Sequence, residues 1–119
     1  MIEILPQSEG NLIAMQIGGK LTLEDYKASW VPRLEQAIET HGKVRVLIYL
    51  DETFEGWETA VLWEDAKVGL KNITAFHKIA LVGGPEWIAK ITEVVGHLMP
   101  GTIKTFPAGA LEEGYSWIE

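Results

Sequence analysis

The sequence predicts an α/β domain with a mainly parallel sheet of about five strands and helices packed on the sheet. Two observations support this class. Short apolar runs alternate with longer amphipathic segments, and the run VRVLIYL at residues 44–50 is almost wholly apolar. Such a run is typical of a strand that is covered on both faces, as in a parallel sheet. The chain of 119 residues suits one domain, which we expect to span residues 1–119.

The strands and helices follow from the same alternation. Residues 2–5 and 11–19 are two apolar runs separated by Pro6 and a short turn, so we expect an opening β-hairpin. Crossovers to parallel strands are right-handed, which predicts a sheet with helices on its faces. The remaining strands are expected at residues 44–50, 78–84 and 102–106, and the remaining helices at residues 58–72, 85–98 and 109–119.

A first helix is expected between Thr22 and Gly42. Thr22 is a suitable N-cap with Asp25 three positions later, close to the capping-box pattern. Pro32 would clash with the carbonyl of Ala28, which predicts a kink or break there. Gly42 is a natural stop for the helix.

Three helices carry apolar stripes that we expect to face the core. The stripes predict that Trp30, Trp63 and Trp87 are buried. Val61 and Val68 lie off the main stripe of the second helix, which makes its apolar face wider than a core contact needs. The stripe of the second helix is Leu62, Trp63, Ala66, Leu70 and Ile73, and that of the third is Trp87, Ile88, Ile91, Val94, Val95 and Leu98.

Composition excludes several functional classes. The net charge of −7 argues against nucleic acid and anionic membranes as partners. No apolar run is long enough to span a membrane, and the N-terminus lacks a signal-peptide pattern. The absence of cysteine rules out thiol chemistry and fits a cytoplasmic protein. No hydrolase elbow, phosphate loop or zinc spacing occurs, so we expect no enzyme activity and no cofactor.

Two loops are candidate sites, because ligands of open α/β sheets bind beyond the carboxyl ends of the strands. They are residues 51–57 and residues 83–86. The second, with its Gly-Gly-Pro, is best interpreted as a turn and helix cap. In the first, Phe54 and Trp57 either line a pocket or cover the sheet. The loop also carries acids that could supply oxygen ligands to Mg²⁺ or Ca²⁺, but their spacing matches no metal loop and we expect no metal; they are Asp51, Glu52, Glu55 and Glu58.

The pattern of segments resembles the SpoIIAA-like proteins, whose fold is related to the STAS domains of bacterial anti-sigma factor antagonists. The resemblance covers nearly the whole chain. Its most specific segments are LTLEDY at residues 21–26, DETFEGW at residues 51–57 and HKIALVGG at residues 77–84. In phosphoswitch STAS proteins a strand ends in Asp and a phosphorylatable Ser or Thr follows. Asp51 matches that pattern, Glu52 occupies the acceptor position with a fixed charge, and Thr53 is a reserve acceptor.

The resemblance implies a non-enzymatic binding or regulatory module. Our leading hypothesis is contact with an unidentified protein partner, or with a second copy in a homodimer, through the loop from Asp51 to Trp57. Architecture shared with CRAL-TRIO lipid-transfer domains implies an alternative, a small apolar ligand or lipid held between the sheet and the second helix. Phe54, Trp57, Leu62 and Trp63 would line that pocket. An enzyme would have to rely on Asp51 or Glu52 with a perturbed pKa.

Overall fold

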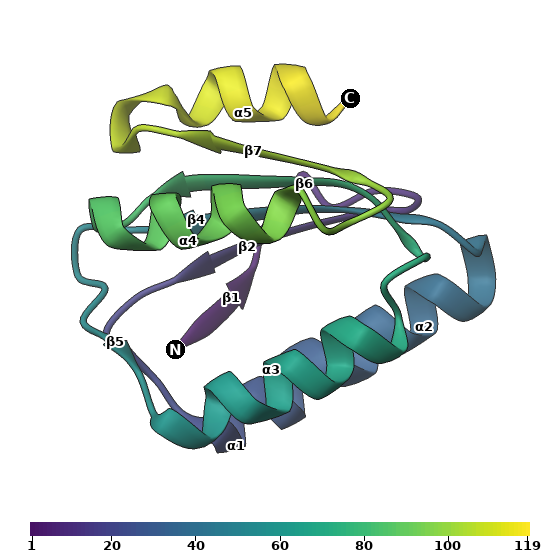
Figure 1. The fold of residues 1–119 in the computed structure, drawn as a ribbon, viewed down its shortest axis with the longest axis horizontal. Coiled ribbons are helices and arrows are strands. Elements are labelled where there is room, and N and C mark those ends of the chain that lie inside the picture. The colour runs from purple at the N-terminus through teal and green to yellow at the C-terminus, as the bar shows by residue number, and fades with distance from the viewer.

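The computed structural model describes residues 1–119 and contains a five-stranded sheet with helices on both of its sides (Figure 1). The strands are β1 (Ile2–Ile4), β2 (Leu12–Ile17), β3 (Lys20–Leu21), β4 (Val44–Leu50), β5 (Gly56–Trp57), β6 (Phe76–Gly83) and β7 (Thr102–Phe106). The helices are α1 (Leu23–Asp25), α2 (Val31–His41), α3 (Thr59–Lys71), α4 (Glu86–Gly96) and α5 (Leu111–Ile118), with a π-helical turn at Tyr26–Trp30 and a 3-10 turn at Ala108–Ala110.

The main sheet confirms the predicted fold class. Its strand order is β1-β2-β4-β6-β7, with β1 antiparallel to β2 and every other neighbouring pair parallel. The apolar run at residues 44–50 forms the central strand β4, where Val44, Val46, Leu47 and Leu50 are buried. Burial on both faces explains why this strand has no polar alternation.

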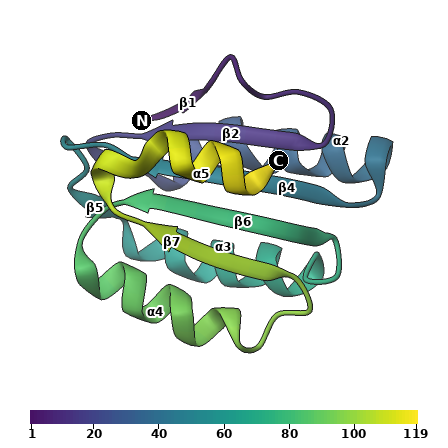
Figure 2. The same cartoon turned by 90° about the horizontal axis from the view of Figure 1, so that it is seen from above.

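The sheet separates two hydrophobic cores (Figure 2). Helix α5 lies over the middle of one face, whereas α2 and α3 lie beyond the other, and α4 packs beside the edge strand β7. Successive residues of a strand point to opposite faces, so Ala14 and Leu47 join the α5 core while Ile13 and Val46 join the larger core under α2. The candidate site lies on the side of the sheet that holds the larger core.

The first helix begins and breaks where the sequence predicts. The Thr22 hydroxyl accepts a hydrogen bond from the Asp25 N–H over 3.2 Å, which confirms the N-cap. The break before Pro32 takes the form of the π-helical turn, in which the Val31 N–H bonds to the Tyr26 carbonyl. Both Tyr26 and Trp30 are buried by this wider turn, which confirms the prediction for Trp30.

A second, two-stranded sheet occupies part of the region that the sequence predicts as loop. Strands β3 and β5 pair in parallel, with Leu21 opposite Trp57. The flanking bonds from the Glu55 N–H to the Gly19 carbonyl, at 2.7 Å, and from the Glu58 N–H to the Leu21 carbonyl, at 2.9 Å, extend this pairing. Strands of two residues carry no periodicity, so the sequence pattern could not reveal them.

Helix α3 turns a different face toward the core than the one predicted. Val61 is its buried residue, whereas Leu62, Trp63 and Leu70 are 47%, 72% and 72% exposed. The prediction that Trp63 is buried is therefore wrong. The β3–β5 pairing, together with a 2.8 Å bond from the Leu23 N–H to Glu58 Oε1, ties the start of α3 to α1. In that orientation Val61 and Val68, two turns apart, face the core.

The apolar side of α4 is also largely exposed. Of its predicted buried face only Ile88 is buried, and Trp87 is 52% exposed, so the prediction for Trp87 is wrong. Helix α4 packs along the edge strand β7 instead of lying flat on the sheet, which leaves most of its stripe open (Figure 2). The other exposed members of the stripe are Ile91, Val94, Val95 and Leu98.

Candidate functional site

Asp51 anchors the turn at the carboxyl end of β4. Its Oδ1 accepts hydrogen bonds from the Thr53 hydroxyl at 2.6 Å and the Thr53 N–H at 2.9 Å. Its Oδ2 accepts a 2.7 Å bond from the Gln16 side-chain amide. The bonds from Thr53 and then Gln16 hold the pKa of the Asp51 carboxyl below its usual range. Asp51 is therefore an ionised structural anchor whose two oxygens are both engaged.

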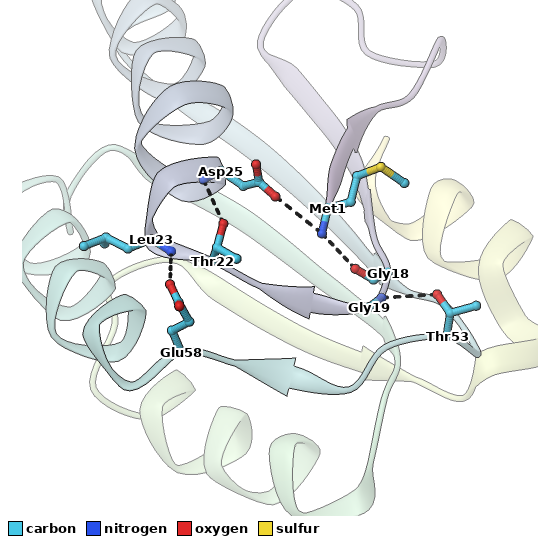
Figure 3. Close-up of polar contacts among 8 residues, drawn as sticks. All are labelled: Met1, Gly18, Gly19, Thr22, Leu23, Asp25, Thr53 and Glu58. Atoms are coloured by element: carbon cyan, nitrogen blue, oxygen red, sulfur yellow. Dashed lines mark hydrogen bonds and ion pairs between the residues drawn. The ribbon is translucent and has the colours of Figure 1, made fainter.

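Thr53 ties the same turn to the end of β2 (Figure 3). The Gly19 N–H donates to the Thr53 carbonyl at 3.0 Å and lies 3.2 Å from the Thr53 hydroxyl oxygen. The turn packs tightly against Gly18, because a Cβ at this position would come within 2.6 Å of Thr53 Oγ1 and 2.9 Å of Asp51 Oδ2. The Thr53 hydroxyl thus both donates and accepts within the turn, whereas the neighbouring Glu52 is exposed.

An open apolar pocket of about 220 Å³ lies between the sheet and α3. Fourteen of its 16 lining residues are hydrophobic, and Asp65 and Thr92 are among the lining residues that bring polar atoms. The aromatic part of the lining is Tyr26, Trp30, Phe54 and Trp57, and the aliphatic part is Ile2, Met15, Ile17, Leu21, Ile48, Leu50, Val61, Leu62, Leu81 and Ile88.

Phe54 and Trp57 serve both purposes that the sequence leaves open. Each is partly buried against the larger core, and each also lines the pocket. Their ring centroids lie 5.8 Å apart, and the Trp57 ring meets the edge of the Trp87 ring at 5.7 Å. The aromatic chain from Phe54 to Trp87 therefore joins the β5 loop to α4 on one side of the pocket.

Tyr26 and Asp65 place a polar pair in the pocket wall. The Tyr26 hydroxyl donates a hydrogen bond to Asp65 Oδ1 over 2.6 Å. Asp65 keeps contact with solvent, yet protein atoms crowd its carboxyl group, and this desolvation raises the pKa of Asp65 against the lowering effect of the Tyr26 bond. Burial and then the nearby Asp65 charge raise the pKa of Tyr26 far above its ordinary value, so the phenol remains a donor.

The site residues proposed from the sequence fall into separate places. Asp51 and Thr53 are bonded into the turn, and Glu52 faces solvent. Phe54, Trp57 and Leu62 line the pocket. Trp63 is 72% exposed and is not part of the pocket lining.

Sequence reasoning missed Tyr26 and Asp65. A signal for Asp65 was present, because it follows Val61 by four positions and precedes Val68 by three, which puts an acid on the inward face of α3. Tyr26 begins the segment that Pro32 disrupts, and π-helical turns occur frequently at functional sites.

The second candidate loop is explained by its backbone. Gly83 and Gly84 have φ values of 81° and 82°, which other residues rarely adopt. A Cβ at Gly83 would lie 2.5 Å from the Leu50 carbonyl oxygen. Pro85 then precedes α4 as its N-cap residue, one position before the helix and not within its first turn as predicted.

The acids of the first loop do not converge. Asp51 is used by the turn, and the Glu58 carboxylate accepts from the Leu23 N–H. No group of three His, Asp or Glu side chains in residues 1–119 is arranged to hold a metal ion. The loop between β4 and α3 therefore uses Asp51 and Glu58 as hydrogen-bond acceptors that fix its backbone.

The fold and the pocket together define a small α/β module with an open apolar pocket on one side of its sheet. The SpoIIAA-like family model matches residues 12–119, and the chain belongs to the SpoIIAA-like family. A structure similar to it is that of an uncharacterized DUF3478-family protein with a SpoIIAA-like fold from Shewanella loihica PV-4. That similarity has a TM-score of 0.75 and 29% identity over 100% of this chain and 93% of that chain.

Two further findings concern relatives and membrane spans. A search of curated proteins found no match. None of the helices is long and apolar enough to cross a membrane. The family match supports a regulatory module of the STAS type in general.

Proposed function

We propose that this SpoIIAA-like domain is a non-enzymatic binding module whose pocket holds a small apolar ligand. The observation that carries the proposal is the pocket of about 220 Å³ with 14 hydrophobic lining residues. Ligand sites are typically concave and apolar with a few polar groups. An apolar cavity of about 150 Å³ accepts benzene, so this pocket suits a ligand of about six to eight carbon atoms.

The loop from Asp51 to Trp57 supports the ligand alternative better than it supports a protein contact. Asp51 and Thr53 direct their polar groups to one another and to Gln16 and Gly19. The loop's large aromatic side chains line the pocket. The exposed acids Glu52 and Glu55 are the groups of the loop that remain for a partner, whereas its aromatics are already positioned for a ligand.

The test is a titration of methyl-labelled protein with 1-hexanol, followed by NMR. We expect shift changes at pocket methyl groups such as Ile48 and Ile88, and none at Ile118, which is buried in the α5 core. The variant Ile48→Trp fills the pocket and is expected to weaken binding at least about tenfold. Its matched control is Tyr49→Trp, the next residue of β4, which packs against the opposite core.

Two results would overturn the proposal. One is a set of shift changes spread evenly over both cores. The other is unchanged hexanol affinity in a folded Ile48→Trp variant, since a filled pocket cannot hold the ligand.

A second candidate function is self-association, which the exposed apolar side chains of α3, of α4 and of the turn after α4 support. Trp63 and Leu70 are each 72% exposed, and Val94 and Leu98 are 64% and 77% exposed. Large exposed apolar patches are typical of interfaces. Helix α3 carries two acids and two bases and α4 carries two acids and one base, which leaves only one of the chain's seven net negative charges on these helices. A second copy would therefore meet little repulsion there.

Light scattering over a concentration series tests the dimer. We expect the mass of two chains at high concentration, and one chain for Trp63→Glu. Thr40→Glu makes the same charge change on α2 and is expected to leave the dimer intact. A single-chain mass at every concentration would contradict the second candidate.

A further inference from the structure

Asp65 is the one charged residue in the lining of the pocket. Its Oδ1 is occupied by the Tyr26 hydroxyl, a neutral donor, and Asp65 forms no ion pair. Lys27 of the π-helical turn and Lys67 of α3 itself are paired instead with Glu64, at 3.7 Å and 3.3 Å. Asp65 is an exposed residue at the pocket wall, and no ion pair of the protein neutralises its carboxylate.

The rest of the lining is also suited to a positive charge. Tyr26, Trp30, Phe54 and Trp57 bring four aromatic rings to the same pocket. The face of an aromatic ring attracts an ammonium group, most strongly when water is excluded. A carboxylate and several aromatic rings around one small cavity form an environment that favours a cation with an apolar body over a neutral molecule of the same shape.

We propose that the pocket recognises a primary ammonium group on a short apolar chain or ring, with Asp65 as its counter-ion. The inference rests on the proposed function, because it names the ligand class of the same pocket. An ammonium group donates three hydrogen bonds, of which one or more would reach the Asp65 carboxylate. The apolar body would occupy the space beside Ile48 and Ile88.

Ligands with an anionic head are disfavoured by the same arrangement. A carboxylate in the pocket would face Asp65 directly, on a chain whose net charge is already −7. A neutral alcohol can donate one hydrogen bond to Asp65 but gains no attraction between opposite charges. The expected order of affinity is therefore ammonium, then alcohol, then carboxylate.

A competing interpretation is that Asp65 serves only to hold Tyr26 in place. The variant Asp65→Asn separates the two, since its amide oxygen can still accept the bond from Tyr26 while its charge is removed. A structural role alone would leave the ranking of ligands unchanged in this variant.

The experiment compares hexylammonium, 1-hexanol and hexanoate at pH 7, binding being followed by calorimetry and by the Ile48 and Ile88 methyl signals. Hexylammonium is protonated at this pH, as is a lysine side chain, whose pKa is about 10.4. We expect hexylammonium to bind at least about tenfold more tightly than hexanoate. Asp65→Asn is expected to lose about tenfold in hexylammonium affinity and to keep 1-hexanol within about twofold. Glu39→Gln, an exposed site on α2, makes the same charge change and is expected to alter neither.

Each outcome decides a separate point. Equal or tighter binding of hexanoate, or unchanged hexylammonium affinity in Asp65→Asn, would overturn the ammonium proposal while 1-hexanol binding leaves the apolar pocket intact. Failure of all three probes to bind would overturn the proposed function together with the inference. An equal loss in Asp65→Asn and Glu39→Gln would assign the effect to net charge and not to Asp65.

Discussion

The Tyr26 hydroxyl donates a hydrogen bond to Asp65 Oδ1 over 2.6 Å, and this bond joins the π-helical turn to α3 at the wall of the apolar pocket. The two residues are 39 positions apart in the chain. Their pairing exists because the turn before Pro32 directs Tyr26 inward, and because the face of α3 that carries Val61 and Asp65 is turned toward the core. The polar feature of the pocket thus depends on two local irregularities of the fold.

Removing the Tyr26 hydroxyl tests this bond directly. Tyr26→Phe is expected to lower the free energy of unfolding by about 1 kcal/mol, since water can still reach Asp65. It is also expected to raise the pKa of Asp65 further, because in the wild type the Tyr26 bond lowers this pKa against the effect of desolvation. A carbon-13 NMR titration of the carboxyl group measures this. Tyr115→Phe is the control, and a fall in the pKa of Asp65 in Tyr26→Phe would contradict the assignment.

The stability of Asp65→Asn is expected to depend on pH with a defined sign. Desolvation raises the pKa of Asp65 in the folded state, whereas an aspartate in an unfolded chain has a pKa of about 3.9. The cost of the partly desolvated charge is therefore fully present above the folded-state pKa and absent below the unfolded one. Asp65→Asn, which keeps an acceptor for Tyr26, should melt at a higher temperature than the wild type at pH 7. The difference should shrink below pH about 4, and a difference that grows on acidification would refute the sign.

The tight packing of Gly18 against the turn at Asp51 can be tested by a substitution to alanine, with Gly69 of α3 as the control position. In Gly18→Ala the new Cβ meets Thr53 and Asp51 oxygens at 2.6 Å and 2.9 Å, so the turn must shift. We expect a loss of about 1–3 kcal/mol in the free energy of unfolding. Gly69→Ala adds a Cβ that meets nothing within 4 Å in the last turn of α3, and is expected to stabilise by about 0.5 kcal/mol. Urea unfolding measures both, and equal effects would show that the tight contact at Gly18 is unimportant.

Two tryptophans test the corrected orientation of α3. Trp30 is 6% exposed and packs in the larger core, so Trp30→Ala is expected to cost about 3–5 kcal/mol. Trp63 is 72% exposed, and Trp63→Ala is expected to change stability by less than about 0.5 kcal/mol. Chemical unfolding at low protein concentration, where self-association is avoided, compares them. A large loss for Trp63→Ala would support the face that the sequence pattern predicted.

The sheet could be predicted because its strongest signal is local. Apart from Arg45 the run at residues 44–50 is apolar, which indicates a central parallel strand without knowledge of its neighbours, and β4 has those bounds. Thr22 and Pro32 likewise act on the backbone within one or two turns, so the N-cap and the break were foreseen.

The orientation of α3 and α4 could not be predicted in the same way. The apolar pattern of α3 has two candidate faces, and the choice depends on the β3–β5 pairing between residues about 36 positions apart. For α4, packing along an edge strand leaves an apolar stripe exposed that periodicity alone assigns to a core. The Tyr26–Asp65 pair depends on the orientation of α3 and on the π-helical turn, and for that reason the sequence predicted the aromatics of the pocket but not its charge.

The most direct test of ligand binding is a search for intermolecular nuclear Overhauser effects between 1-hexanol and methyl-labelled protein. The proposed function predicts contacts from the hexanol chain to methyl groups of Ile48, Leu81 and Ile88, which line the pocket. It predicts none to Ile118 on the other side of the sheet. Effects confined to exposed methyl groups of α4 such as Val94 and Val95, with none in the pocket, would contradict it.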